Sequence, residues 1–156
     1  MNTSESTELT PLPLELSGEL PCGHLEIEVT PEHIDSLGHV NNAVYVQYFE
    51  RGRIAFYAQL GLALENDHPP RLGTVVVNLN VNFRAECVAG DRLHLVTRGY
   101  RRGNRSFALQ QHLTRPEGTP VADCDVTSVI MNLDSRSIES IPAALSAALP
   151  IPQPKP

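Results

Sequence analysis

The chain has 156 residues, of which 41% are hydrophobic and 19% charged, and this composition is typical of one globular domain that folds around a core without disulfide bonds. The formal net charge of −6 excludes a general nucleic-acid binder, because that class carries an excess of Lys and Arg on one face. No apolar run approaches the roughly 20 residues that cross a bilayer, so we expect no membrane span.

The two ends of the chain differ from its middle. Residues 1–22 are polar and acidic and contain three prolines without clean periodicity, which predicts a flexible N-terminal tail. No basic start is followed by an apolar core, so we expect no signal peptide. Residues 23–150 form the predicted domain, and the proline-rich residues 151–156 a C-terminal tail. The three cysteines lack metal-ligand spacing, which predicts free thiols and a cytoplasmic protein.

The first predicted elements are a strand and a long helix. Apolar and polar residues alternate from His24 to Val29, as in a half-buried strand. The segment from Val46 to Gly61 is helix-like, and Asn41 or Asn42 is its expected N-cap. Its apolar stripe at helical spacing consists of Tyr45, Tyr48, Phe49, Gly52 and Phe56. A glycine inside a helix costs about 1 kcal/mol relative to alanine, so we expect another element to pack closely there.

Four more strands are expected after the helix, over 74–84, 92–101, 105–115 and 121–133, and a short last helix over 141–149. Short glycine-containing turns join the last three strands, which indicates antiparallel hairpins. One long helix can bury its stripe only against such a sheet. The sequence therefore predicts an α+β fold in which a five-stranded antiparallel sheet is wrapped around one central helix.

The loop before the helix, Asp35-Ser36-Leu37-Gly38-His39-Val40-Asn41-Asn42, gathers polar groups at a helix N-terminus. Such a terminus stabilises developing negative charge. Asp35 is suited to act as a general base or nucleophile, and otherwise forms a turn. His39 is either a second acid/base or a packing residue. Asn41 either positions Asp35 or a water molecule, or caps the helix.

Positive charge is concentrated in one further segment. Four of the twelve cationic residues lie within eight positions, at Arg98, Arg101, Arg102 and Arg105. Guanidinium groups bind phosphates well. The cluster is therefore either a phosphate-binding site or a solvated face.

The run from Ile34 to Asn42, with Tyr45 and the segment from Tyr48 to Arg53, resembles the hot-dog-fold acyl-CoA thioesterases of the 4-hydroxybenzoyl-CoA thioesterase type. The likeness covers most of residues 24–133. It implies a hot-dog fold and hydrolysis of an acyl-CoA thioester to free acid and coenzyme A. It implies no metal and no cofactor, since coenzyme A is part of the substrate. It also implies a homodimer or homotetramer with sites between subunits.

The resemblance also implies roles for individual residues. Asp35 matches the catalytic aspartate, and Asn42 the helix-start residue whose backbone N–H polarises the thioester carbonyl. Gly73 resembles a glycine whose N–H reaches the same oxygen. Tyr45 belongs to the motif and is counted with the substrate-binding residues. The residues that match the contacts to coenzyme A phosphates are Arg101, Arg102, Arg105 and Ser106.

Two departures from the benzoyl-type pattern bear on the substrate. His33 stands where those enzymes have an acidic residue, and the HVNN run is closer to bacterial medium- and long-chain thioesterases and plant acyl-carrier-protein thioesterases. We therefore expect a fatty-acyl group, carried by coenzyme A or by acyl-carrier protein. The alternatives are a hot-dog enoyl-CoA hydratase and a non-catalytic acyl-CoA-binding protein.

Overall fold

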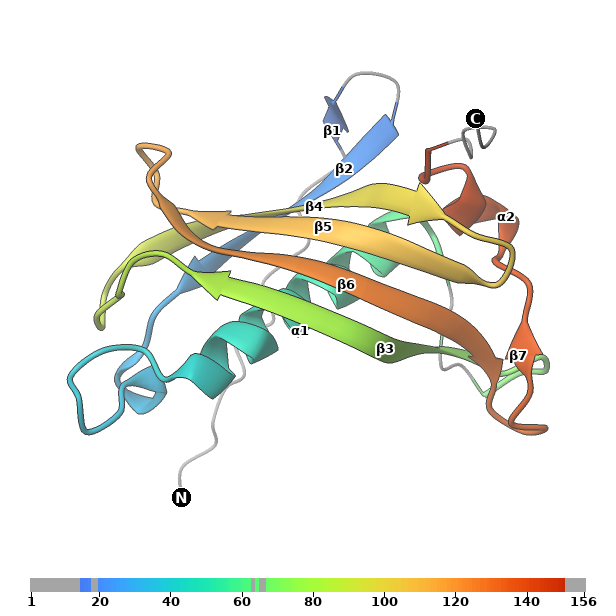
Figure 1. The fold of residues 1–156 in the computed structure, drawn as a ribbon, viewed down its shortest axis with the longest axis horizontal. Coiled ribbons are helices and arrows are strands. Elements are labelled where there is room, and N and C mark those ends of the chain that lie inside the picture. Colours follow the sequence, from blue (N-terminus) through green and yellow to red (C-terminus); the bar gives the residue numbers. More distant parts are fainter. Residues whose placement is uncertain (1–14, 18–19, 63, 65–66, 151–156) are drawn as a thin grey trace.

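A computed structural model describes residues 15–17, 20–62, 64 and 67–150. Its strands form one antiparallel sheet in the order β1-β2-β4-β5-β6-β3, and β7 pairs with β6 (Figure 1). The strands are β1 (Glu15–Ser17), β2 (Leu20–Glu28), β3 (Leu72–Phe83), β4 (Arg92–Arg102), β5 (Ser106–Thr114), β6 (Pro120–Asn132) and β7 (Ile138–Glu139). The helices are the 3-10 turn η1 (Pro31–His33), α1 (Asn42–Gln59) and α2 (Ala143–Ser146).

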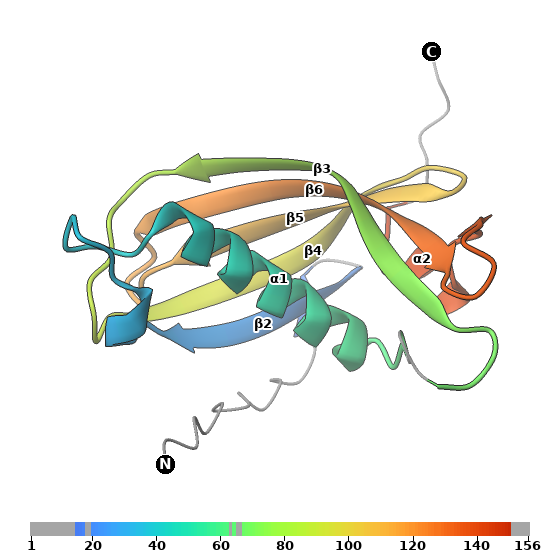
Figure 2. The same ribbon diagram turned by 90° about the horizontal axis from the view of Figure 1, so that it is seen from below.

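The five long strands β2, β4, β5, β6 and β3 curve around α1, which lies along the inner face of the sheet (Figure 2). This confirms the predicted α+β fold with a five-stranded antiparallel sheet around one long helix. The sheet also contains β1 and β7, of three and two residues, which the sequence did not predict. Strands this short are below the length at which alternation of polar and apolar residues becomes visible.

Local capping determines both ends of α1. Asn41 is the N-cap, as predicted: its Oδ1 accepts the Ala43 N–H at 2.9 Å. The helix therefore begins at Asn42 rather than at Val46. Past the other end, Gly61 has a φ of +75°, a left-handed conformation that glycine adopts without strain.

The whole predicted stripe of α1 is buried against the sheet. Tyr48, Phe49 and Phe56 have no exposed surface. They meet the inward-facing residues of alternating strand positions, which are Leu25, Ile27, Leu93, Leu95, Leu109 and Leu113. One of the polar contacts inside this core joins the helix to the sheet: the fully buried Gln111 side chain donates to Phe49 O at 2.9 Å. Packing and this bond together hold the helix against β4 and β5.

Gly52 lies where α1 comes closest to the sheet. A Cβ atom there would lie 2.3 Å from Leu95 Cδ2 and 2.9 Å from Gln111 Nε2, and both neighbours are fully buried. The close packing predicted from the helix stripe is confirmed.

We expect Gly52→Ala to destabilise the protein. Overpacking of this kind costs about 1–3 kcal/mol, which exceeds the gain of about 1 kcal/mol in helix propensity. The melting temperature should fall by roughly 2–4 °C for each net kcal/mol. In a Leu95→Ala background the same change should be neutral or stabilising; an equal loss in both backgrounds would show that contact with Leu95 is not the cause.

The ends of the domain differ from the prediction. Residues 20–22 belong to β2, and Cys22 is only 3% exposed, so the predicted tail over residues 1–22 extends too far. Pro21 and Gly23 hide the strand pattern, and pairing with β1 and β4 forms it. Residues 1–14 and the predicted C-terminal tail, 151–156, lie outside the described residues. The predicted last helix is reduced to the four residues of α2.

One edge of the sheet is formed by β3, which pairs only with β6 among the described strands. Its polar residues Asn78, Asn80 and Asn82 are exposed. The same strand exposes four large apolar side chains, between 37% and 57% of their surface: Val76, Val77, Leu79 and Phe83. A long, apolar free edge of this kind favours pairing with another strand.

Candidate active site

The turn between η1 and α1 is folded around the side chain of Asp35. Its Oδ1 accepts the Leu37 N–H at 2.8 Å, and its Oδ2 accepts the Asn41 side-chain N–H at 3.1 Å. The Gly38 N–H donates to Asp35 O at 3.0 Å, and Gly38 has a φ of +85°, which explains the glycine. These bonds hold the partly buried carboxylate in one orientation.

Asn41 connects this turn to the helix. Its side chain donates to the Asp35 carboxylate and accepts the Ala43 N–H, while its backbone N–H donates to His33 O at 3.1 Å. The two functions considered for Asn41, capping the helix and positioning Asp35, are thus performed by the same amide. The position of Asp35 relative to the first turn of α1 follows from these contacts.

Asn42, the first residue of α1, has a backbone N–H with no acceptor among the described residues. Helix N-termini carry partial positive charge because such N–H groups have no partner within the helix. A free N–H of this kind can stabilise an oxyanion that forms near it.

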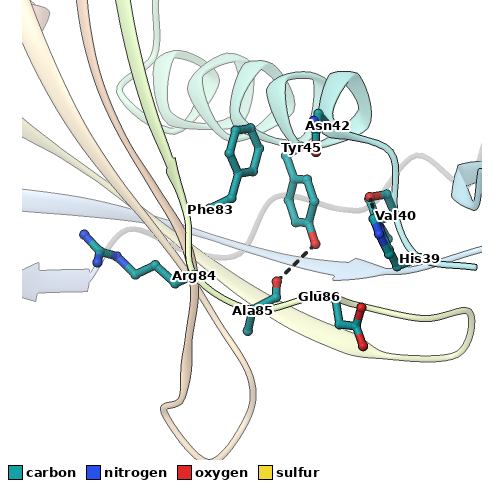
Figure 3. A pocket seen from close by; sticks show the side chains of 8 residues that line it. All are labelled: His39, Val40, Asn42, Tyr45, Phe83, Arg84, Ala85 and Glu86. Atoms are coloured by element: carbon teal, nitrogen blue, oxygen red, sulfur yellow. Dashed lines mark hydrogen bonds between the residues drawn. The ribbon is translucent and has the colours of Figure 1, made fainter. Parts of the chain in front are cut away.

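A pocket with a volume of about 260 Å³ opens beside this turn (Figure 3). Its lining consists of His39, Val40, Asn42, Tyr45, Phe83, Arg84, Ala85 and Glu86. The Tyr45 hydroxyl donates to Ala85 O at 3.3 Å, and its ring packs edge-on against Phe83 with centroids 5.4 Å apart. Burial raises the pKa of Tyr45, so the hydroxyl remains protonated at neutral pH.

His39 lies on the wall of this pocket (Figure 3). Its Nδ1 is 3.2 Å from Val40 O. The neighbouring Val40 is fully buried, and its N–H donates to Cys87 O at 2.9 Å, so the segment carrying His39 is fixed to the chain that follows β3. A direct chemical function of His39 stays a prediction.

Within one chain, the remaining predicted site residues lie far from Asp35. Gly73 is at the start of β3, whereas α1 begins beside the other end of that strand (Figures 1 and 2). The hairpin between β4 and β5 lies at the same distant end, where Arg102 donates to Ser146 O of α2 at 3.4 Å. This hairpin carries the predicted phosphate-binding residues Arg101, Arg102, Arg105 and Ser106.

The pocket also contains residues that the sequence analysis missed. Phe83, the last residue of β3, and the three residues after it form the wall opposite His39 and Tyr45 (Figure 3). About forty positions separate these two walls along the chain. The edge-on contact between Tyr45 and Phe83 brings them together, and no pattern local to either segment predicts it.

Among the described residues, no group of three or more His, Cys, Asp or Glu side chains is arranged to hold a metal ion. Neither α1 nor α2 is long and apolar enough to cross a membrane. All three cysteines are free, and all three are buried.

A family model described as the thioesterase-like superfamily matches residues 29–149. The chain belongs to the thioesterase-like superfamily. The matched region contains the Asp35 turn, α1 and all long strands except β2. The hot-dog fold and the thioesterase class predicted from the sequence are both confirmed.

The chain is similar to two named thioesterases and to one solved structure. The long-chain acyl-CoA thioesterase FadM of Escherichia coli is 30% identical over 131 residues, which cover 80% of this chain and 94% of that protein. The chloroplastic acyl-acyl carrier protein thioesterase ATL2 of Arabidopsis thaliana is 31% identical, but the match covers 54% of this chain and 47% of ATL2. The fold matches that of SAV2348 from Staphylococcus aureus, solved in complex with CoA, with a TM-score of 0.75 at 20% identity, covering 90% of this chain and 94% of SAV2348.

Proposed function

We propose that this protein is an acyl-CoA thioesterase that hydrolyses fatty-acyl thioesters, with Asp35 as its catalytic carboxylate. The observation that carries the proposal is the arrangement at the start of α1. A carboxylate fixed by two hydrogen bonds lies in the turn that leads directly to the free N–H of Asn42. The long-chain acyl-CoA substrate in the name of FadM supports the choice of substrate.

In this mechanism the Asn42 N–H binds the thioester carbonyl oxygen and stabilises the negative charge that forms on it. Asp35 either removes a proton from the attacking water or attacks the carbonyl carbon itself, forming an anhydride that water then hydrolyses. In both routes the C–S bond breaks, the acyl group leaves as an acid and the sulfur is protonated to the thiol. One good oxyanion donor contributes about 2.7–4 kcal/mol to transition-state stabilisation.

We also propose that the active unit is a homodimer formed through β3, with the tetramer as a further assembly. Two copies of β3 can pair antiparallel along their free edges, which buries the exposed apolar residues of that strand. Antiparallel pairing sets the Leu72 end of one strand beside the Phe83 end of the other. The partner's Gly73 then approaches the pocket of the first chain. This accounts for the separation of Gly73 from Asp35 within one chain.

The arginine-bearing hairpin would bind the phosphates of the substrate in the same assembly. Arg101 and Arg105 are exposed, while Arg102 is partly buried against α2. Their concentrated positive charge in a protein of net charge −6 favours an anionic ligand. Both coenzyme A and the phosphopantetheine of acyl-carrier protein offer phosphate groups. We expect coenzyme A to be preferred, and the reaction to need no further cofactor, in the cytoplasm.

The decisive experiment is thiol release from a panel of short, medium, long and aromatic acyl-CoAs. We expect turnover that rises with chain length from short to long fatty-acyl groups, with aromatic groups slower. The panel should include a 2-enoyl-CoA, monitored for loss of its double bond. Loss of the double bond without thiol release would support a hydratase instead. Tight binding of acyl-CoA with neither reaction would support a binding protein.

A further inference from the structure

The imidazole ring of His33, which precedes the Asp35 turn, is held by two neighbours. Its Nδ1 lies 2.8 Å from the hydroxyl of Tyr48, and the Thr30 backbone N–H donates to the same nitrogen at 3.3 Å. Tyr48 is fully buried in α1, and its ring meets the His33 ring edge-on at a centroid distance of 5.3 Å. A core residue of the helix thus contacts the segment that leads into the site.

These contacts favour a neutral His33. A backbone N–H only donates, so the bond from Thr30 N–H to Nδ1 forms when Nδ1 carries no proton. The neutral ring then carries its proton on Nε2, which lies 3.5 Å from Thr30 Oγ1. A second proton would have to bind Nδ1, where it would face the Thr30 N–H and take the Tyr48 hydroxyl or Thr30 Oγ1 as its acceptor. Protonation of His33 therefore removes the bond from the Thr30 N–H and reorients the hydroxyl groups around the ring.

The backbone of His33 is tied to the catalytic turn through Asn41. His33 O accepts the Asn41 N–H at 3.1 Å, and the Asn41 side chain donates to Asp35 Oδ2 at 3.1 Å. A single bridge between Ile34 and Val40 closes the loop between these contacts. A chain of hydrogen bonds thus runs from Tyr48 in the core through His33 and Asn41 to Asp35.

We propose that neutral His33 is a positioning residue, which Tyr48 and Thr30 hold in place and which keeps Asp35 aligned with the N-terminus of α1, so that protonation of His33 inactivates the enzyme at acid pH. The proposal rests on the proposed thioesterase function for its readout in activity. Nothing in it requires His33 to touch the substrate.

Burial and the charge of Arg51 also favour the neutral form of His33. Burial, and then the positive charge of Arg51 on α1, lower the pKa of His33, while the neighbouring Glu32 opposes this. Burial raises the pKa of Tyr48 to about 12, so its hydroxyl stays protonated. The folded state binds the His33 proton less tightly than the unfolded state does. Neutral His33 therefore contributes to the free energy of unfolding above its ordinary pKa of 6.5. This contribution is lost as the pH falls from 6.5 through the lower pKa that His33 has in the folded state.

The test compares pH profiles of kcat and KM for three variants on one acyl-CoA. His33→Leu and Tyr48→Phe should each lower kcat by about tenfold or more with little change in KM, because misplacement of a catalytic group costs rate. His33→Asn supplies an acceptor near the position of Nδ1 that does not titrate. The His33→Asn variant should have most of the wild-type kcat, and the acid limb of its kcat–pH profile should shift to lower pH by about one unit.

A matched control is His112→Asn, the same change at a histidine on β5, outside the site. This variant should keep the profile of the wild type. A His33→Asn profile with the wild-type acid limb would overturn the proposal, as would a Tyr48→Phe variant with full kcat.

Imidazole ¹⁵N NMR tests the arrangement without any substrate. The His33 signals should show an unprotonated Nδ1 and a protonated Nε2 near neutral pH, and Tyr48→Phe should change them. A proton on Nδ1 would overturn the proposal. If the wild type releases no thiol from any thioester, the thioesterase function fails, and the NMR result still decides how His33 is held.

Discussion

Asp35→Asn is expected to lower kcat by about 10²- to 10⁴-fold, the range for loss of a catalytic acid/base group. The amide has the size of the carboxylate, but it is neither a base nor a nucleophile. The NH2 group of the amide would also face one of the two donors that now hold Asp35, the Leu37 N–H or the Asn41 side chain. The measurement is thiol release from the best acyl-CoA of the panel, with the melting temperature recorded to show that the variant folds.

The control for this experiment is Ser36→Ala, in the same turn. Ser36 is exposed and contributes no side-chain bond to the Asp35 carboxylate, so its loss should leave kcat and KM close to those of the wild type. An Asp35→Asn enzyme within a few-fold of wild-type kcat would contradict the catalytic function of Asp35. The reaction would then have to depend on another group of the pocket, such as His39 or Glu86.

Val77→Lys is expected to disrupt the dimer and most of the activity together. Val77 is 57% exposed on the free edge strand, at the irregular point of its pairing with β6. In an antiparallel β3 pair this region lies near the two-fold axis, so the lysines of two copies would approach each other. Like charges in an interface cost several kcal/mol, which corresponds to a rise in Kd of about 100-fold or more.

Analytical ultracentrifugation should then show a species of one 17.1 kDa chain, with kcat/KM falling in parallel. Val88→Lys is the matched control, because Val88 is 47% exposed but lies beyond β3. It should keep both the dimer and the activity. A Val77→Lys protein that remains dimeric would show that the copies do not pair through β3. A fully active monomer would show that each chain contains a complete site.

The elements with local causes can be predicted from the amino-acid sequence. Asn41 caps α1 because its amide reaches an N–H two residues away. The Asp35 turn closes over four residues, with Gly38 supplying the positive φ. The helix stripe and the long strands follow from periodicities of 3.6 and 2 residues. Each of these interactions joins residues only a few positions apart in the sequence. The sequence alone therefore predicts the turn and the helix.

Other features depend on contacts between distant segments, so they follow from the three-dimensional fold and not from any local pattern. Residues 20–22 became part of β2 because β1 and β4 pair with them, although Pro21 obscures their pattern. The pocket formed where Tyr45 of α1 met Phe83 at the end of β3. The hydrogen bond between Tyr48 and His33 joins residues that no short motif connects.

The directions of the strands explain why the predicted site residues are divided between two ends of the molecule. β3 runs antiparallel to β6, β6 to β5 and β5 to β4. The start of β3, with Gly73, therefore lies at the same end of the sheet as the arginine hairpin between β4 and β5, and Asp35 lies at the other end (Figures 1 and 2). These directions depend on the pairing of β3 with β6, which lie far apart in the sequence, and side-chain alternation within one strand does not predict which strands pair.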